Sequence, residues 1–187
     1  MTILNSTNNQ DFPFEWVNLD FFPDSKGSRY EIYLNKNNNL LEDLLQMFRS
    51  LFQSVDNNIK IYNYSWWDFC LDTWDIENDD YNYELTGKSN ESKAYLKMLQ
   101  SSFIEKDYSG ICTCNDWNKF LPLVLTCILT HQAPYSPLFF NTEEDFFFYF
   151  HHTGSIGFYH NSERTSVKKI MSIAEREYRI VAYPPPC

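Results

Sequence analysis

The sequence predicts a single α+β domain over residues 1–187, with a mainly antiparallel sheet packed against about four helices. Several short segments alternate between apolar and polar residues, or are rich in aromatic and β-branched residues, as strands are. Other segments repeat apolar residues at intervals of three and four, which is the spacing of one helix face. A chain of 187 residues suits one domain and is long enough to bury a core.

Two helices are expected in the first half of the chain. Residues 40–55 place leucine, phenylalanine and valine at spacings of three and four, with Asn39 as the N-cap. A second apolar stripe predicts a helix at about 89–104, capped by Ser89 or Asn90. Residues before the first helix alternate loosely until a Pro-Asp pair, so a strand or an extended arm is expected there, at 12–22.

The third predicted helix contains a proline. It begins near Asn115 or Asp116 and runs to about His131, with Pro122 inside it. Proline removes a helix hydrogen bond but suits the first helical position. Either the first turn is therefore separate, or the main helix starts at Pro122.

A fourth helix is expected from Ser162 or Thr165 to about Glu177, where the last apolar stripe ends. The remaining segments with strand character lie on both sides of the predicted helices, and their order favours an antiparallel sheet. These predicted strands cover 29–34, 58–66, 111–114, 136–140 and 178–183.

A histidine-rich segment, EEDFFFYFHHTGSIGFYHNS (143–162), could be a catalytic or metal-binding cluster or an aromatic hairpin. Its alternation and its Thr-Gly-Ser turn predict strands near 145–152 and 156–160. Adjacent strand residues point to opposite faces, so His151 and His152 cannot both bind one ion without a bulge. We therefore predict no metal at these histidines and a structural role for the hairpin.

The register of this hairpin depends on the turn. If Thr153-Gly154 is a two-residue turn, Phe150 lies opposite Gly157, and an aromatic ring over a cross-strand glycine is an ordinary packing arrangement. If the turn is instead Gly154-Ser155, His152 lies opposite Gly157. Both registers leave the histidines structural.

Other chemical sites are not expected. The spacing of Cys112 and Cys114 is not that of a zinc ribbon, and the glycines form no phosphate-binding or dinucleotide motif. No catalytic triad or paired-carboxylate spacing is present, so no catalytic residue, metal or cofactor is predicted. An enzyme centred on the histidines, with Ser155 beside His152, is kept as an alternative.

Composition limits the classes of partner. The net charge of −10 and the pI near 4.7 disfavour direct nucleic-acid binding and favour a basic partner or solubility. No apolar run approaches the length of a membrane span, and the first residues lack the features of a signal peptide. Five scattered cysteines fit a reducing compartment, so we expect a cytoplasmic protein.

The acidity is concentrated in one stretch that is also rich in aromatic residues, WWDFCLDTWDIENDDYNYEL (66–85). Seven carboxylates occur here without a lysine or arginine before Lys88. The simpler interpretation is a partly buried helix or loop with a solvated acidic side. The functional interpretation is a partner surface, because aromatic residues are enriched at the centres of interfaces. The predicted partner-binding residues are Asp72, Trp74, Asp75, Glu77, Asp79, Asp80 and Tyr81.

The run NDWNKFLPLVLTCIL (115–129), followed by FFFYFHHTGSIGFYH (146–160), resembles segments of small bacterial immunity proteins. Such proteins neutralise toxins of contact-dependent inhibition and related polymorphic toxin systems. The resemblance covers about a third of the chain. It implies an acidic, cytoplasmic, non-enzymatic protein that binds one cognate toxin domain, often a nuclease.

Three hypotheses follow from the sequence. The first is an immunity protein that covers the basic active-site surface of a toxin. The second is another protein-interaction or regulatory module, and the third is the histidine-dependent enzyme. A toxin gene immediately upstream would favour the first hypothesis, whereas a metal or a pocket at the histidines would favour the third.

Overall fold

The computed structural model describes residues 2–36 and 38–184. The chain is α+β, with four α-helices and mainly antiparallel sheet in its described part, as predicted. Its contacts divide it into two compact units, one made of residues up to Asp11 with Ile61–Pro137, and the other of Phe12–Lys60 with the residues from Leu138 on. The expectation of a single domain over 1–187 stays a prediction. None of the described helices combines the length and the apolar character needed to cross a bilayer.

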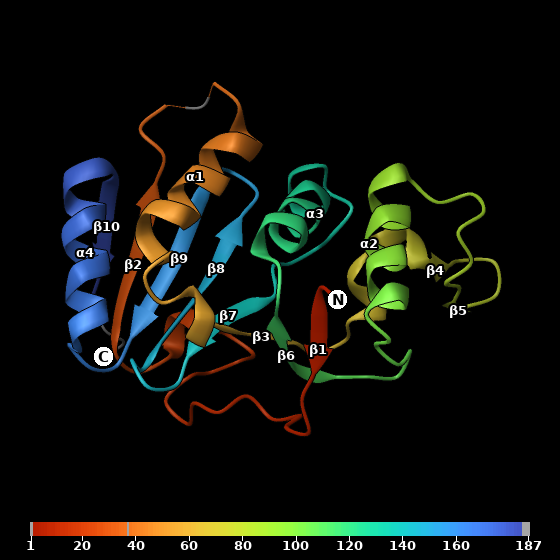
Figure 1. The fold of residues 1–187 in the computed structure, drawn as a ribbon, viewed down its shortest axis with the longest axis horizontal. Coiled ribbons are helices and arrows are strands. Elements are labelled where there is room, and N and C mark those ends of the chain that lie inside the picture. The colour runs from red at the N-terminus through yellow and green to blue at the C-terminus, as the bar shows by residue number, and fades with distance from the viewer. Residues whose placement is uncertain (1, 37, 185–187) are drawn as a thin grey trace. The chain divides into compact units, whose positions relative to one another are not determined.

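The first unit contains three neighbouring strands and two helices that pack against each other (Figure 1). The strand order is β1-β6-β3, and β1 pairs with β6 in antiparallel fashion. Two further strands of two residues each, β4 and β5, form a separate small hairpin. The elements of this unit are β1 (Leu4–Ser6), β3 (Lys60–Asn63), β4 (Trp74–Asp75), β5 (Asp80–Tyr81), α2 (Asn90–Ser101), β6 (Gly110–Cys114) and α3 (Trp117–Leu129).

The N-cap of α3 is Asp116, whose side chain accepts a hydrogen bond from the backbone N–H of Lys119. The helix continues through Pro122, so neither of the two expected interruptions occurs. Proline at this position gives up one hydrogen bond, to the carbonyl of Asn118. Burial of the apolar face of α3 offsets that loss, because Phe120, Leu121 and four further residues of the helix are buried.

The second unit contains five neighbouring strands, in the order β7-β8-β9-β2-β10, and two helices. Each neighbouring pair in this sheet is antiparallel. Helices α1 and α4 contact each other. The elements are β2 (Ser28–Tyr33), α1 (Leu40–Phe52), β7 (Leu138–Asn141), β8 (Phe146–His151), β9 (Ser155–His160), α4 (Thr165–Glu177) and β10 (Arg179–Tyr183).

The sheet of the second unit is covered on both faces. Phe52 of α1 stacks on Phe148 with ring centroids 3.9 Å apart, so α1 covers the face of β8 that bears Phe148. The neighbouring Phe147 points to the opposite face. There it contacts Trp16 and Phe22, which belong to the extended arm predicted at 12–22. This arm forms no strand and instead packs its aromatic rings on the sheet.

The predicted hairpin is confirmed, but its register differs from both expectations. Three residues, 152–154, connect β8 to β9, and Gly154 adopts a positive φ of 89° that favours glycine. Tyr149 therefore lies opposite Gly157, in place of Phe150 or His152. The expected packing principle holds with a different aromatic residue, since a Cβ on Gly157 would overlap the ring of Tyr149.

Candidate partner-binding surface

The segment 66–85 is divided between the core and the surface. Trp66 and Trp67 are buried, and their indole N–H groups donate to the carbonyl oxygens of Gly110 and Ile104 at 3.0 Å each. Two short 3₁₀ helices follow, at Trp67–Phe69 and Leu71–Thr73. The chain then emerges as the β4–β5 hairpin. We call residues 74–81 the acidic hairpin.

The turn of the acidic hairpin is built by one carboxylate. Asp75 Oδ1 accepts hydrogen bonds from the backbone N–H groups of Glu77 and Asn78, and Oδ2 accepts one from the Asn78 side-chain amide at 2.7 Å. The side-chain bond from Asn78, together with these backbone bonds, lowers the pKa of Asp75. Asp79 takes a positive φ of 54°, which closes the turn. The predicted site residue Asp75 is therefore also a structural residue.

The hairpin brings most of the predicted site residues together. Trp74 lies opposite Tyr81, and Asp75 lies opposite Asp80, in the antiparallel ladder. Glu77 and Asp79 lie in the exposed turn between the strands. In the described chain, none of these carboxylates forms a salt bridge. Directly opposed like charges repel, so the hairpin concentrates negative charge that is not neutralised within the chain.

Asp72 differs from the other predicted residues. Its carboxylate accepts a hydrogen bond from the backbone N–H of Ser89 at 2.9 Å, and its carbonyl oxygen accepts one from Lys88 Nζ at 2.8 Å. Ser89 is in turn the N-cap of α2. Asp72 thus fixes the chain that enters α2. Its role in partner binding stays a prediction.

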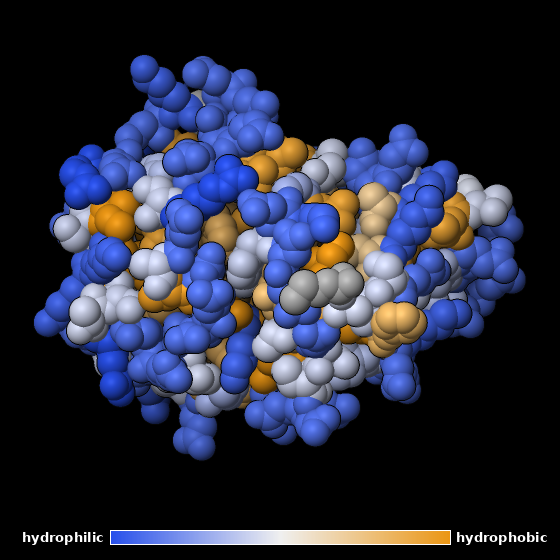
Figure 2. All heavy atoms as spheres, in the orientation of Figure 1, coloured by the Kyte–Doolittle hydropathy of each residue, from blue (hydrophilic) through white to orange (hydrophobic). Residues whose placement is uncertain are grey.

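The aromatic side chains of the hairpin are accessible. Trp74 and Tyr81 are 41% and 43% exposed, and Ile76 at the turn is 85% exposed. Figure 2 shows that the surface over β4 and β5, at the right of the view, is mostly hydrophilic. Exposed aromatic rings within a polar surround are the usual arrangement of residues that anchor protein interfaces.

An open pocket of about 450 Å³ lies beside Tyr83, just after the hairpin. Tyr83 stacks on Tyr81 with ring centroids 6.2 Å apart, and its hydroxyl donates to Asp68 Oδ1 at 2.6 Å. The hydroxyl of Ser65 donates to the other oxygen of Asp68 at 2.5 Å. The pocket is lined by Tyr64, Ser65, Asp68, Tyr83, Lys106, Asp107 and Ser109.

One cationic side chain of the protein itself, Lys106, lines this pocket. Lys106 Nζ lies 5.6 Å from the centroid of the Tyr83 ring, and Asp68 and Asp107 line the same pocket. Burial, followed by the hydrogen bond to Asp68, raises the pKa of Tyr83, so its hydroxyl remains a donor. Asp68 and Tyr83 belong to the acidic stretch 66–85. The pocket could not be predicted from that stretch, because Lys106 and Asp107, which also line it, lie outside the stretch.

The histidines do not converge. His151 and His160 lie at opposite ends of the β8–β9 ladder, since His160 pairs with Phe146. Five residues of strand separate the two positions by roughly 17 Å. His151 Nδ1 is 2.8 Å from Thr153 Oγ1, whereas His160 is buried and stacks on Tyr30. No group of three or more possible metal ligands occurs in the part of the chain that the structure describes.

Cys70, Cys112 and Cys127 are buried. Burial raises the pKa of Cys112, which keeps this thiol protonated at neutral pH. Cys70 and Cys127 are both buried with their sulfur atoms 3.9 Å apart, as free thiols. That the protein is not an enzyme stays a prediction.

Comparison of the chain with protein-family models, with curated proteins and with solved structures found no match.

Proposed function

We propose that this chain is a cytoplasmic immunity protein that binds one cognate bacterial toxin domain and covers its basic active-site surface. The acidic hairpin is the proposed contact surface. The toxin would be basic because a nuclease or other nucleic-acid-directed domain needs cationic side chains to hold phosphates. Carboxylates on a protruding hairpin can occupy the same cations.

The observation that supports this proposal most directly is the charge balance of the hairpin. Asp75, Glu77, Asp79 and Asp80 lie within six residues, and none has an ion-pair partner in the described chain. Their mutual repulsion costs free energy in the isolated protein. A basic partner converts this repulsion into attraction, which acts over roughly 8–10 Å at ordinary salt and speeds encounter.

The aromatic residues supply the second part of the proposed mechanism. Charged residues at the rim of an interface mainly steer association, whereas buried aromatic anchors mainly slow dissociation. Trp74 and Tyr81 form one exposed aromatic pair at the base of the hairpin. Once a partner covers them, the apolar area they lose from water stabilises the complex.

The pocket beside Tyr83 supplies a specific contact for the same partner. Lys106 near the Tyr83 ring is an internal example of a cation held by an aromatic face. An arginine or lysine side chain from the partner could enter beside it, with the carboxylates of Asp68 and Asp107 as acceptors. In this proposal the hairpin and the pocket, joined by the stacked rings of Tyr81 and Tyr83, act as one acidic, aromatic surface.

A growth assay tests the proposal. A basic toxin domain encoded beside this gene is expressed in a bacterium with or without this protein, and growth is measured. The wild-type protein should restore growth. The triple variant Trp74→Ala/Glu77→Gln/Asp79→Asn should restore it less well while it accumulates to the same level.

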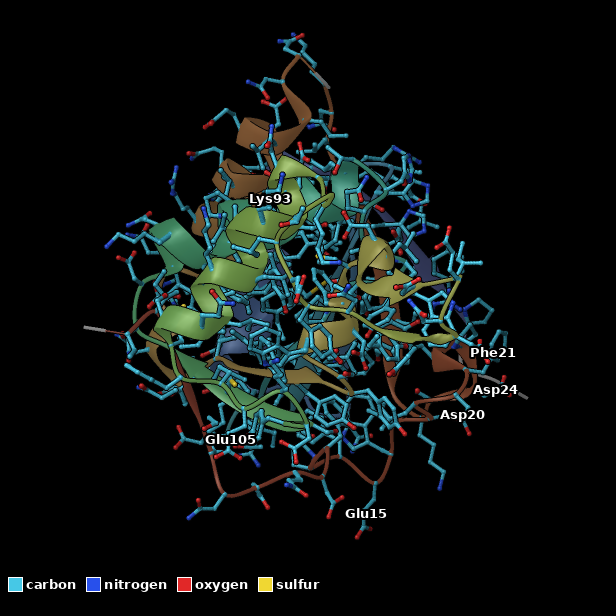
Figure 3. All side chains as sticks on the ribbon, turned by 90° about the vertical axis from the view of Figure 1, so that its right-hand side faces the viewer. Glu15, Asp20, Phe21, Asp24, Lys93 and Glu105 are labelled. Carbon is cyan, nitrogen blue, oxygen red and sulfur yellow. The ribbon has the colours of Figure 1, made fainter. Side chains whose placement is uncertain are left out.

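The control variant removes one glutamate and one aspartate charge, as the hairpin variant does, but from another surface. Glu15 and Asp20 are exposed on the arm of the second unit, and Figure 3 shows both side chains projecting outward. Glu15→Gln/Asp20→Asn should protect as well as the wild type. Equal protection by the hairpin variant and the wild type would overturn the assigned surface. Failure of the wild type to protect against its neighbouring toxin would overturn the function.

A further inference from the structure

We propose that two copies of this chain associate edge to edge through β10, antiparallel and centred on Val181, so that the sheet of the second unit continues across a two-fold axis. The inference concerns a surface separate from the acidic hairpin and does not depend on the proposed function. It rests on the exposure of one sheet edge and on the pairing pattern of its strand.

Strand β10 is the outer edge of the sheet in the described chain. It is the last strand in the order β7-β8-β9-β2-β10, and within the described chain no other strand pairs with its outer side. Each of its residues is at least partly exposed. Native edges are usually protected by shortness, charged side chains, proline, bulges or a covering helix or loop. Of these, β10 has one charged residue, Arg179, and the strand contacts α4. The five residues of β10 contain no proline, although Pro184 follows directly, and their pairing with β2 is continuous, one residue to one residue. By contrast, edge strand β1 has three residues.

The pairing of β10 with β2 uses a pattern that both strands share. Strand β2 contains Arg29 and Tyr33, and β10 contains Arg179 and Tyr183, each pair four residues apart. The antiparallel register places Arg179 opposite Tyr33 and Tyr183 opposite Arg29. Both pairs are cation–π contacts, with the guanidinium carbon 3.9 Å from the Tyr33 ring centroid and 4.4 Å from that of Tyr183. Arginine and tyrosine therefore meet at both ends of the ladder.

A second β10 offers the same pattern as β2. When β10 pairs with its own copy in antiparallel register about Val181, Arg179 lies opposite Tyr183 of the copy, at both ends. Ile180 then lies opposite Ala182 of the copy, and Val181 meets itself on the axis. Aromatic and β-branched cross-strand pairs stabilise sheets, and an interface of this kind closes after two copies. The outer side of β10 is thus complementary to itself.

Helix α4 would also meet its own copy in this arrangement. It contacts β10, and Figure 1 shows it in front of β10, at the left of the view. Lys169 of α4 lines a pocket together with α1 residues, so that side of the helix faces α1. Lys168, Met171 and Glu175, spaced by three and four, share a different side. Two antiparallel copies of α4 would place Lys168 of each near Glu175 of the other, with Met171 between them.

Cross-linking tests the register directly. In a Cys114→Ser/Cys187→Ser background, Val181→Cys should form a disulfide-linked dimer on mild oxidation, because the two copies of residue 181 meet on the axis. Ala182→Cys is the matched control, since its copies are offset along the strands beyond disulfide distance. Absence of the Val181→Cys dimer, or equal cross-linking of both variants, would contradict the proposed register.

Sedimentation or light scattering tests the association itself. The wild-type protein should dimerise with a dissociation constant below about 0.3 mM, as expected of a small interface. Val181→Lys should weaken dimerisation at least about tenfold, because two lysines would then oppose each other. The same lysine lies opposite Glu31 within one chain, so the monomer should stay folded.

Mixing Val181→Lys with Val181→Glu should restore a dimer, because a lysine of one copy would then oppose a glutamate of the other. A wild-type protein that stays monomeric up to about 0.3 mM, or a dimer that Val181→Lys leaves unchanged, would overturn the proposal.

Discussion

Trp74 and Tyr81 lie opposite each other in the two-residue ladder of the acidic hairpin, with ring centroids 4.9 Å apart and planes at 76°. The other cross-strand pair, Asp75 with Asp80, is repulsive. The aromatic pair and the Asp75 turn therefore hold the hairpin together. The same two rings are exposed and form the proposed partner surface, so their structural and binding roles can be separated by measurement.

Trp74→Ala should weaken partner binding by about 2 kcal/mol, mainly through faster dissociation, because it removes an aromatic anchor. The melting temperature of the whole protein should change little, since the Trp74–Tyr81 pair holds only the short hairpin and Trp74, which is 41% exposed, lies outside the core. Surface plasmon resonance and thermal unfolding measure the two effects. Phe103→Ala, which truncates a side chain that is 82% exposed in the same unit, should leave affinity unchanged. Equal affinity of Trp74→Ala and the wild type would remove Trp74 from the interface.

Tyr83→Phe should lower the free energy of unfolding by about 1–2 kcal/mol. The substitution keeps the ring but removes the hydroxyl that donates to Asp68 at 2.6 Å, and hydrogen bonds to charged groups contribute at this level. Chemical denaturation measures the change. Tyr64→Phe is the control, because Tyr64 lines the same pocket but is 77% exposed. If both substitutions have the same small effect, the Tyr83–Asp68 hydrogen bond does not stabilise the fold.

His160 should make the fold less stable in mild acid. Burial lowers the pKa of His160 below its usual value of 6.5. As the pH falls below 6.5, the unfolded state gains a proton before the folded state does, so stability present above this pH is progressively lost. The difference in unfolding free energy between about pH 7.5 and pH 5.5 should therefore shrink in His160→Phe. This variant keeps a ring that can stack on Tyr30. An unchanged difference would show that other groups cause the acid sensitivity.

Gly157→Ala should destabilise the second unit by about 1–3 kcal/mol, because the added methyl group would overlap the Tyr149 ring in a packed sheet. Replacing Tyr149 by leucine removes that ring. In the Tyr149→Leu background the same Gly157→Ala substitution should cost less, and a double-mutant cycle measures the difference. Additive effects of the two substitutions would show that the contact across the ladder is not what requires glycine.

Sequence periodicity predicted the elements whose structure is determined locally. The apolar spacing of α1 and its Asn39 cap are properties of neighbouring residues, and both are confirmed. The register of β8 and β9 could not be obtained in this way. It depends on a three-residue connection with Gly154 at positive φ and on the fit of Tyr149 over Gly157, which are relations across the ladder.

The sequence predicted where the candidate surface lies in the chain, but not that it is a hairpin or which distant residues it contacts. Like charges and tryptophans identified the acidic stretch, whereas strands of two residues are too short to show a period. The structural contact of Asp72 with Ser89 and the pocket around Tyr83 join residues far apart in sequence. Such contacts depend on the tertiary structure and leave no mark in local composition.

The association rate constant is the most direct test of the acidic hairpin as a capture surface for a basic partner. Stopped-flow measurements should compare the wild type, Glu77→Gln/Asp79→Asn and the control Glu15→Gln/Asp20→Asn at low and high salt. Glu77 and Asp79 are suitable because they are exposed turn residues without a salt bridge in the described chain. We expect the hairpin variant to associate several-fold more slowly at low salt, and high salt to bring the three rates together. A hairpin variant that binds as fast as the wild type at low salt would contradict the account.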